Sequence, residues 1–93
     1  MKMYNTTEYL RYLHLAEKFV IEAEFSYKNN ALNDAMRHYY HAEMLFEQAK
    51  EIADSYLELK QKLVAQEGEL YCLQKIDELE KFKNISKNDA VKC

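Results

Sequence analysis

The segment with the clearest periodicity covers residues 35–56 and reads AMRHYYHAEMLFEQAKEIADSY. Its apolar residues alternate in spacing between four and three, which places their side chains on one face of an α-helix. Small and aromatic residues share this face: Ala35, Tyr39, Ala42, Phe46, Ala49, Ala53 and Tyr56. Because alanines let a neighbouring helix approach closely while rings fill the remaining space, the pattern predicts a helix that packs in a bundle.

A second stripe with the same period lies upstream. Its members are Tyr9, Leu13, Ala16, Val20, Ala23 and Tyr27. The polar run Asn5-Thr6-Thr7-Glu8 is typical of a helix start, and Asn29-Asn30 is typical of a helix end, since asparagine tolerates the left-handed conformation found there. We therefore expect helices over about 6–28 and 31–53, which their short connection makes an antiparallel hairpin.

The boundary after the second helix has two interpretations. Ser55-Tyr56-Leu57-Glu58 is a capping-box pattern, which predicts a third helix over about 55–83. Tyr56 also continues the preceding stripe, so the alternative is a second helix that runs on to about Gln66, with a shorter helix after it. We favour the break near Asp54-Ser55 because it gives three helices of similar length.

The apolar face of the third helix changes direction along the segment. Leu59, Leu63 and Leu70 share one face, whereas Cys72, Ile76 and Leu79 lie nearly opposite. The rotation centres on Gly68, and a glycine costs roughly 1 kcal/mol inside a helix. A kink or break at Gly68 is therefore expected. Residues 84–93 lose the period and are expected to form a flexible tail.

The composition agrees with a wholly helical domain. The chain has 93 residues, no proline and one glycine, so it lacks the turn residues of an all-β sandwich or barrel. Hydrophobic residues make up 48% and charged residues 31%, which is typical of a globular protein. We predict that residues 1–83 form a single all-α domain, an antiparallel three-helix bundle with up-down-up topology.

Charge and cysteine content argue against several classes of protein. With 13 basic and 16 acidic residues, the chain carries a net charge of −3 and lacks the basic face of a general nucleic-acid binder. No stretch approaches the ~18 consecutive apolar residues of a membrane span, so membrane insertion is not expected. The first residues show no signal-peptide core. Cys72 and Cys93 are too few for a disulfide scaffold, and a reducing, cytoplasmic setting fits best.

His38 and His41, three residues apart with Glu43 close by, are the candidate metal ligands. Two imidazoles at this spacing can reach one metal ion. However, the sequence contains neither the Glu-x-x-His pairs of di-iron bundles nor the HExxH zinc motif. We interpret the histidines as partly exposed surface residues and predict no metal or other cofactor.

The run Arg37-His38-Tyr39-Tyr40-His41 resembles the motif of the HEPN family, small helical proteins that include RNases. The resemblance implies that His41 would act as a general acid and base and that Arg37 would stabilise phosphate charge. Three residues separate Arg37 from His41, fewer than in that family, and the chain is shorter than most members. The alternative function that follows is an RNase or a decayed relative of one.

Residues 34–42 also resemble the second helix of tetratricopeptide-like hairpins, with Ala35, Tyr39 and Ala42 in an Ala-x-x-x-aromatic-x-x-Ala pattern. The usual Trp, Gly and Pro of that repeat are missing, and a single motif cannot form a solenoid of at least three repeats. Residues 16–82 are more similar to the MIT domain, a tetratricopeptide-like three-helix bundle, although the small-acidic ending of its third helix is missing. This resemblance implies a module that binds short helical or extended partner segments in grooves between helices.

We predict a non-enzymatic protein–protein interaction module, either an adaptor or a chaperone-like protein. The predicted partner-binding strip is Met36, Tyr40 and Met44, in which methionine adapts to varied partners and tyrosine anchors them. The alternative is that the third helix covers this strip. Two other functions stay open: a HEPN-like RNase that uses Arg37 and His41, and a small secretion chaperone or inhibitor. The expected partner is a peptide or helix of another protein, and a homo-dimer is also allowed.

Overall fold

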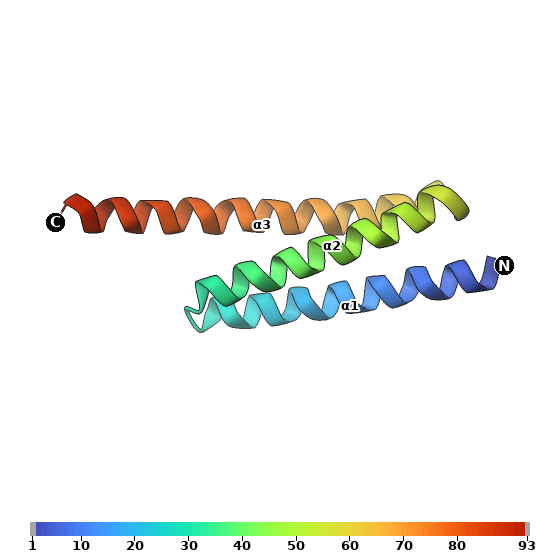
Figure 1. Ribbon diagram of the computed structural model, residues 1–93, viewed down its shortest axis with the longest axis horizontal. Helices are drawn as coiled ribbons and strands as arrows, with labels where there is room; N and C mark the ends of the chain where they lie inside the picture. Colours follow the sequence, from blue (N-terminus) through green and yellow to red (C-terminus); the bar gives the residue numbers. More distant parts are fainter. Residues whose placement is uncertain (1, 93) are drawn as a thin grey trace.

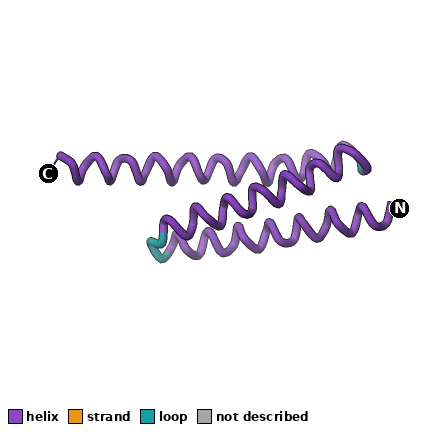
Figure 2. The backbone as a smooth tube through the Cα atoms, viewed as in Figure 1, coloured by secondary structure: helices purple, strands orange, loops and turns teal. Residues whose placement is uncertain are grey.

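The computed structural model describes the backbone of residues 2–92 and the side chains of residues 5–82. It contains three α-helices, α1 (Lys2–Lys28), α2 (Leu32–Tyr56) and α3 (Leu59–Lys92), joined by two short turns (Figures 1 and 2). The described backbone holds no strand, and the helices alternate in direction. The predicted all-α, antiparallel three-helix bundle is therefore confirmed. Over the described residues, none of the helices has the length and apolar character needed to cross a bilayer.

The three helices are arranged as an elongated layer. α2 lies between the other two helices and packs against both, whereas α1 and α3 make little direct contact (Figure 1). One direct link is a hydrogen bond of 2.7 Å from the hydroxyl of Tyr9 to the carbonyl oxygen of Gln61. The molecule measures 60 × 20 × 13 Å. Its radius of gyration is 15.9 Å, against ~12 Å for a compact domain of this length.

The core is built on the predicted face of α2. The residues buried there are Ala35, Tyr39, Ala42, Phe46, Ala49 and Ala53. The other helices contribute Tyr9, Leu13, Ala16 and Ala23 from α1, and Ala65, Cys72, Ile76 and Leu79 from α3. Val20 of the first stripe is half-buried and packs against this core. Two further members of the predicted stripes lie outside it, because each stands in the last turn of its helix. Tyr27 is 52% exposed and Tyr56 is 65% exposed.

The two apolar faces of α3 have different surroundings. The face with Cys72 and Ile76 is buried in the core. The leucines of the other face, Leu59, Leu63 and Leu70, are between 47% and 67% exposed. α3 runs without interruption through Gly68, so the break considered there does not occur.

Close packing between α2 and α3 requires a residue without a side chain at position 68. A Cβ atom built on Gly68 would lie 2.4 Å from Cε1 of the Phe46 ring, far inside ordinary van der Waals distance. The Phe46 side chain is itself buried, so the ring has little room to move aside. Glycine at this position allows the ring of Phe46 to lie directly against the backbone of α3.

The turn between α1 and α2 is a Schellman motif. Asn30 has a φ of 61°, the left-handed conformation expected for this asparagine pair. The amide of Ala31 donates to the carbonyl oxygen of Ser26 at 2.9 Å, and the amide of Asn30 donates to that of Tyr27 at 3.0 Å. Carbonyl groups that the helix end would leave unsatisfied are paired in this way.

The turn between α2 and α3 lies slightly later in the chain than predicted. Ser55 is still helical, and the capping box placed on Ser55-Glu58 is wrong. Instead, the backbone amide of Glu58 donates to the side-chain oxygen of Gln61 at 2.9 Å, the reciprocal half of a capping box. Leu57 is extended and donates its amide to Ala53, which closes α2. Glu58 and Gln61 have the same three-residue spacing as Ser55 and Glu58, so the spacing alone does not distinguish the two positions.

The outer ends of α1 and α3 extend beyond the bounds expected from the sequence. α1 begins at Lys2, not near residue 6, and the helical backbone of α3 continues to Lys92 through the segment expected to be a flexible tail. Neither extension contains a proline or glycine that would end a helix. The side chains of residues 84–93 lie outside the described residues.

Candidate functional site

The three residues of the predicted strip have different surroundings. Met36 is half-buried and packs against the core. Tyr40 is 44% exposed, and its hydroxyl donates to Oε1 of Glu80 on α3 at 3.1 Å. Met44 is 59% exposed and lies in a shallow depression that Phe19 of α1 also lines. Tyr40 thus faces α3, while Met44 lies toward α1, so the three side chains do not line one depression.

A larger pocket lies between the end of α1 and α3. Its volume is about 280 Å³, and the residues that line it are Tyr27, Tyr39, Lys75, Glu78, Leu79 and Phe82; we call it the aromatic groove. α2 supplies Tyr39, α1 supplies Tyr27 and α3 supplies the other four. α1 and α3 touch little, and Tyr39, the α2 residue that lines the pocket, is only 3% exposed.

Aromatic rings and one ion pair set the chemistry of the aromatic groove. The ring of Tyr39 meets that of Tyr71 edge-on, with centroids 6.4 Å apart. Burial, together with neighbouring Tyr71, raises the pKa of Tyr39, so its hydroxyl stays protonated at neutral pH. Lys75 lies over the Tyr71 ring, 5.6 Å from the centroid, and its Nζ is 3.5 Å from Oε2 of Glu78. The groove therefore offers ring surfaces with one charge of each sign beside them.

The sequence contains a signal for this groove that the apolar stripes do not include. Tyr71, Lys75, Glu78 and Phe82 follow one another at spacings of four, three and four, so they share one face of α3. This face differs from both leucine-containing faces that were considered. Its partners Tyr27 and Tyr39 were assigned to helix stripes, but the period of a single helix does not show which other helix lies beside it.

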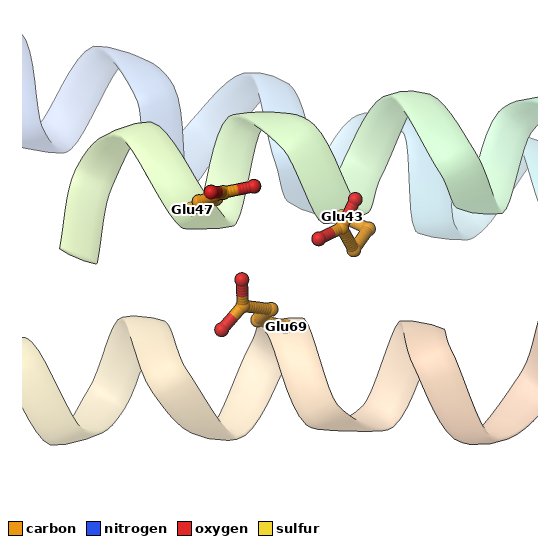
Figure 3. Close-up of side chains that lie close together, drawn as sticks. All are labelled: Glu43, Glu47 and Glu69. Carbon is orange, nitrogen blue, oxygen red and sulfur yellow. The ribbon is translucent and has the colours of Figure 1, made fainter. Parts of the chain in front are cut away.

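A cluster of three carboxylates bridges α2 and α3. Glu43 and Glu47 extend from α2 toward Glu69 on α3 (Figure 3), and one oxygen from each lies within 4.8 Å of the others. Glu69 is 8% exposed. The Nζ of Lys50 lies 2.7 Å from Oε1 of Glu69, which gives this buried carboxylate a counter-charge. The cluster could not be predicted from the sequence, because its members come from separate helices.

The carboxylate cluster has the oxygen ligands that hard divalent cations prefer. The Lys50 ammonium, however, already donates a hydrogen bond to the carboxylate of Glu69, and its positive charge would repel a metal cation placed beside it. Burial, and the neighbouring charges of Glu47 and Glu69, raise the pKa of Glu43 above its usual range. The arrangement therefore acts as an ion-pair network that links α2 to α3 and carries an excess of negative charge.

This excess charge predicts that replacing Glu43 with glutamine stabilises the protein at neutral pH. A carboxyl group whose pKa is raised on folding contributes most stability below its ordinary pKa and loses it as the pH rises through the raised value. Glu43→Gln should raise the unfolding free energy at pH 7, because it removes one charge from the crowded cluster. The gain should shrink as the pH falls toward 4.5, the ordinary pKa of a glutamate.

Urea denaturation at several pH values measures this difference. Glu17→Gln, on the exposed side of α1, is the matched control, and its difference from the parent should be small at every pH. A gain for Glu43→Gln that stays constant across the pH range would contradict the explanation.

The candidate catalytic residues and histidine ligands of α2 contact side chains of α1 and of α2 itself. Arg37 pairs with Asp34 within its own helix turn. The rings of His38 and His41 pack on Phe19 of α1, with centroids 6.0 and 5.2 Å from it. His38 and His41 thus lie on the α1 side of α2, whereas Glu43 faces α3. The trio considered as metal ligands is not brought together.

Comparison with known proteins adds no assignment. No family model matches the sequence, and no significant match was found among curated proteins or solved structures. The function must therefore be inferred from the geometry of the aromatic groove and the surfaces around it.

Proposed function

We propose that the protein is a non-enzymatic protein–protein interaction module that holds one segment of a partner in the aromatic groove. The observation that carries the proposal is the pocket of about 280 Å³ between α1 and α3. Two rings at its mouth, Tyr27 and Phe82, are 52% and 53% exposed. Half-exposed rings beside a preformed apolar pocket are typical of anchor sites in interfaces.

The occupant that suits the groove is an amphipathic helix that inserts one large apolar side chain. The volume lies just below the ~300–1,000 Å³ of pockets that enclose whole small-molecule ligands, so it fits an anchor residue better than a cofactor. The described part of the chain has no sheet edge to which an extended strand could add. A helix laid between α1 and α3 would place its polar side near Lys75 and Glu78, which can pair with either charge.

The MIT-like resemblance supports the same mode of binding, since it implies that partners lie between helices. An adaptor or chaperone-like role follows from it.

We also propose a reducing compartment such as the cytoplasm. Cys72 is a buried free thiol, and burial raises its pKa to about 12, which keeps it protonated and unreactive. A homo-dimer is a separate proposal and rests on a different face of α3.

Peptide selection with the 93-residue chain tests the groove. A displayed library of amphipathic helical peptides is selected on the immobilised protein, and the strongest peptide is titrated by fluorescence anisotropy. Phe82→Ala should weaken its Kd at least about tenfold, as expected for loss of an anchor. The melting temperature should change little, because Phe82 is 53% exposed.

Two further variants make this experiment specific. Phe25→Ala is the matched control, since Phe25 is 69% exposed on α1 and does not line the groove; its Kd should equal that of the parent. Tyr40→Ala tests the strip predicted from the sequence. If Tyr40→Ala abolishes binding and Phe82→Ala does not, the site is at the α2–α3 edge and the aromatic groove is not the site.

A further inference from the structure

α3 carries an exposed apolar seam on the side that α2 does not cover. Its leucines are Leu59, Leu63, Leu70 and Leu73, which are 67%, 47%, 55% and 43% exposed. On the helical period, Leu63 and Leu70 lie nearly opposite the buried Cys72. We call Leu59, Leu63, Gln66, Leu70 and Leu73 the leucine seam.

The spacing of the leucine seam is that of a two-helix coiled coil. Successive members are four, three, four and three residues apart, and Gln66 is the one amide among them. This is the alternation of a and d positions, which pack knobs into holes of a facing helix. A helix that packs only against its own bundle needs one apolar stripe, and α3 already has one in the core. The leucine seam is a second stripe, which its own bundle does not cover.

We propose that the leucine seam joins two copies of this chain through an antiparallel pair of α3 helices. Charge selects the second copy and the direction. Lys60 and Glu67 are both exposed and occupy equivalent positions beside the seam, one heptad apart. When Leu59 faces Leu70 of the second copy, antiparallel helices bring Lys60 of each copy next to Glu67 of the other.

Other alignments lose this complementarity. A shift of one heptad in the antiparallel pair places Glu67 beside Glu67 of the second copy, or Lys60 beside Lys60. In a parallel pair flanking positions pair five residues apart, so Lys60 would have no partner on α3, which begins at Leu59. Glu67 would then meet Lys62, whose Nζ already lies 2.9 Å from Oδ1 of Asp54 in its own chain. The proposed alignment also forms a closed two-fold dimer, in which each contact occurs twice and no seam is left for a third chain.

Sedimentation equilibrium of the full chain tests association through the seam. The parent should show a monomer–dimer equilibrium at concentrations up to ~1 mM. Leu63→Glu should weaken dimerisation at least about tenfold, because two charges enter the centre of the seam. Its circular dichroism should match the parent, since residue 63 is 47% exposed. Ile21→Glu is the matched control on α1, where Ile21 is 69% exposed, and it should dimerise like the parent.

Charge-reversal variants test the antiparallel alignment. Lys60→Glu and Glu67→Lys should each dimerise less well than the parent, since each brings like charges together twice. An equimolar mixture of the two should form heterodimers in preference to either homodimer. The double variant Lys60→Glu with Glu67→Lys should regain the association of the parent.

The proposal is overturned by a parent that stays monomeric over the whole concentration range. It is overturned equally by assemblies that grow beyond two chains, or by a mixture that forms no excess of heterodimer. Phe82→Ala should leave dimerisation unchanged, which separates failure of the leucine seam from failure of the aromatic groove.

Discussion

Ala42→Glu is expected to lower the free energy of unfolding by about 3–5 kcal/mol, a large share of the total for a domain of this size. Ala42 is fully buried, on the face of α2 that forms the core. A glutamate there needs space that the close helix approach does not leave, and its charge loses solvation without a partner. The variant should unfold at much lower urea concentration, measured by circular dichroism at 222 nm.

Gln48→Glu is the matched control for this prediction. It also adds one negative charge to α2, but Gln48 is exposed, and such changes usually alter stability by no more than about 0.5 kcal/mol. If both variants unfolded at the same urea concentration as the parent, Ala42 would not lie in the seam between helices. A loss of equal size in both would instead indicate a general effect of charge on α2.

Helix stripes could be predicted from the sequence wherever one face alone is apolar. α2 is such a case, and six of its seven predicted inner residues are buried. The seventh, Tyr56, lies in the last turn, where the period continues but coverage by neighbouring helices ends. Periodicity reports which side chains share a face, and burial also depends on how far the neighbouring helices extend.

α3 shows why periodicity alone does not identify a core. Both of its faces are apolar, and the exposed one has the larger side chains, including Leu63 and Leu70. The face that meets α2 contains Ala65 and Gly68, which leave room for the ring of Phe46. The small residues of α3 fit the large ring of α2, and this fit determines which face of α3 is buried. Such a fit depends on both helices, so the sequence of one helix does not show it.

The candidate sites were harder to predict because they combine residues from separate helices. Tyr27 and Phe82 line one groove although 55 positions separate them in the chain. The carboxylate cluster likewise joins Glu43 and Glu47 to Glu69. The sequence shows the spacing within each helix, but the crossing of the helices determines which spaced sets meet. The Met36–Tyr40–Met44 strip does not form one surface for the same reason. Tyr40 donates a hydrogen bond to Glu80 on α3, whereas Met44 lies in a depression that Phe19 of α1 also lines.

Gly68→Ala is expected to destabilise the protein, although the same change in an open helix stabilises it by roughly 1 kcal/mol. The added methyl group would lie 2.4 Å from Cε1 of Phe46, and two more atoms of that ring would be within 2.6 Å. Either the ring leaves its buried position or α3 moves away from α2, and overpacking of this kind costs about 1–3 kcal/mol or more. The clash therefore outweighs the gain in helix propensity, and urea denaturation should show a net loss.

A double-mutant cycle with Phe46→Leu isolates the cause. Phe46→Leu alone should destabilise the protein, because it removes part of a buried ring that is 6% exposed. In that background the added methyl group has space, so Gly68→Ala should become neutral or stabilising, with a coupling energy of about 1–3 kcal/mol between the two sites. Additive effects would show that the glycine serves the backbone of α3 and not the Phe46 ring. The change of sign would establish that the size of one side chain on α2 sets how closely α3 can pack.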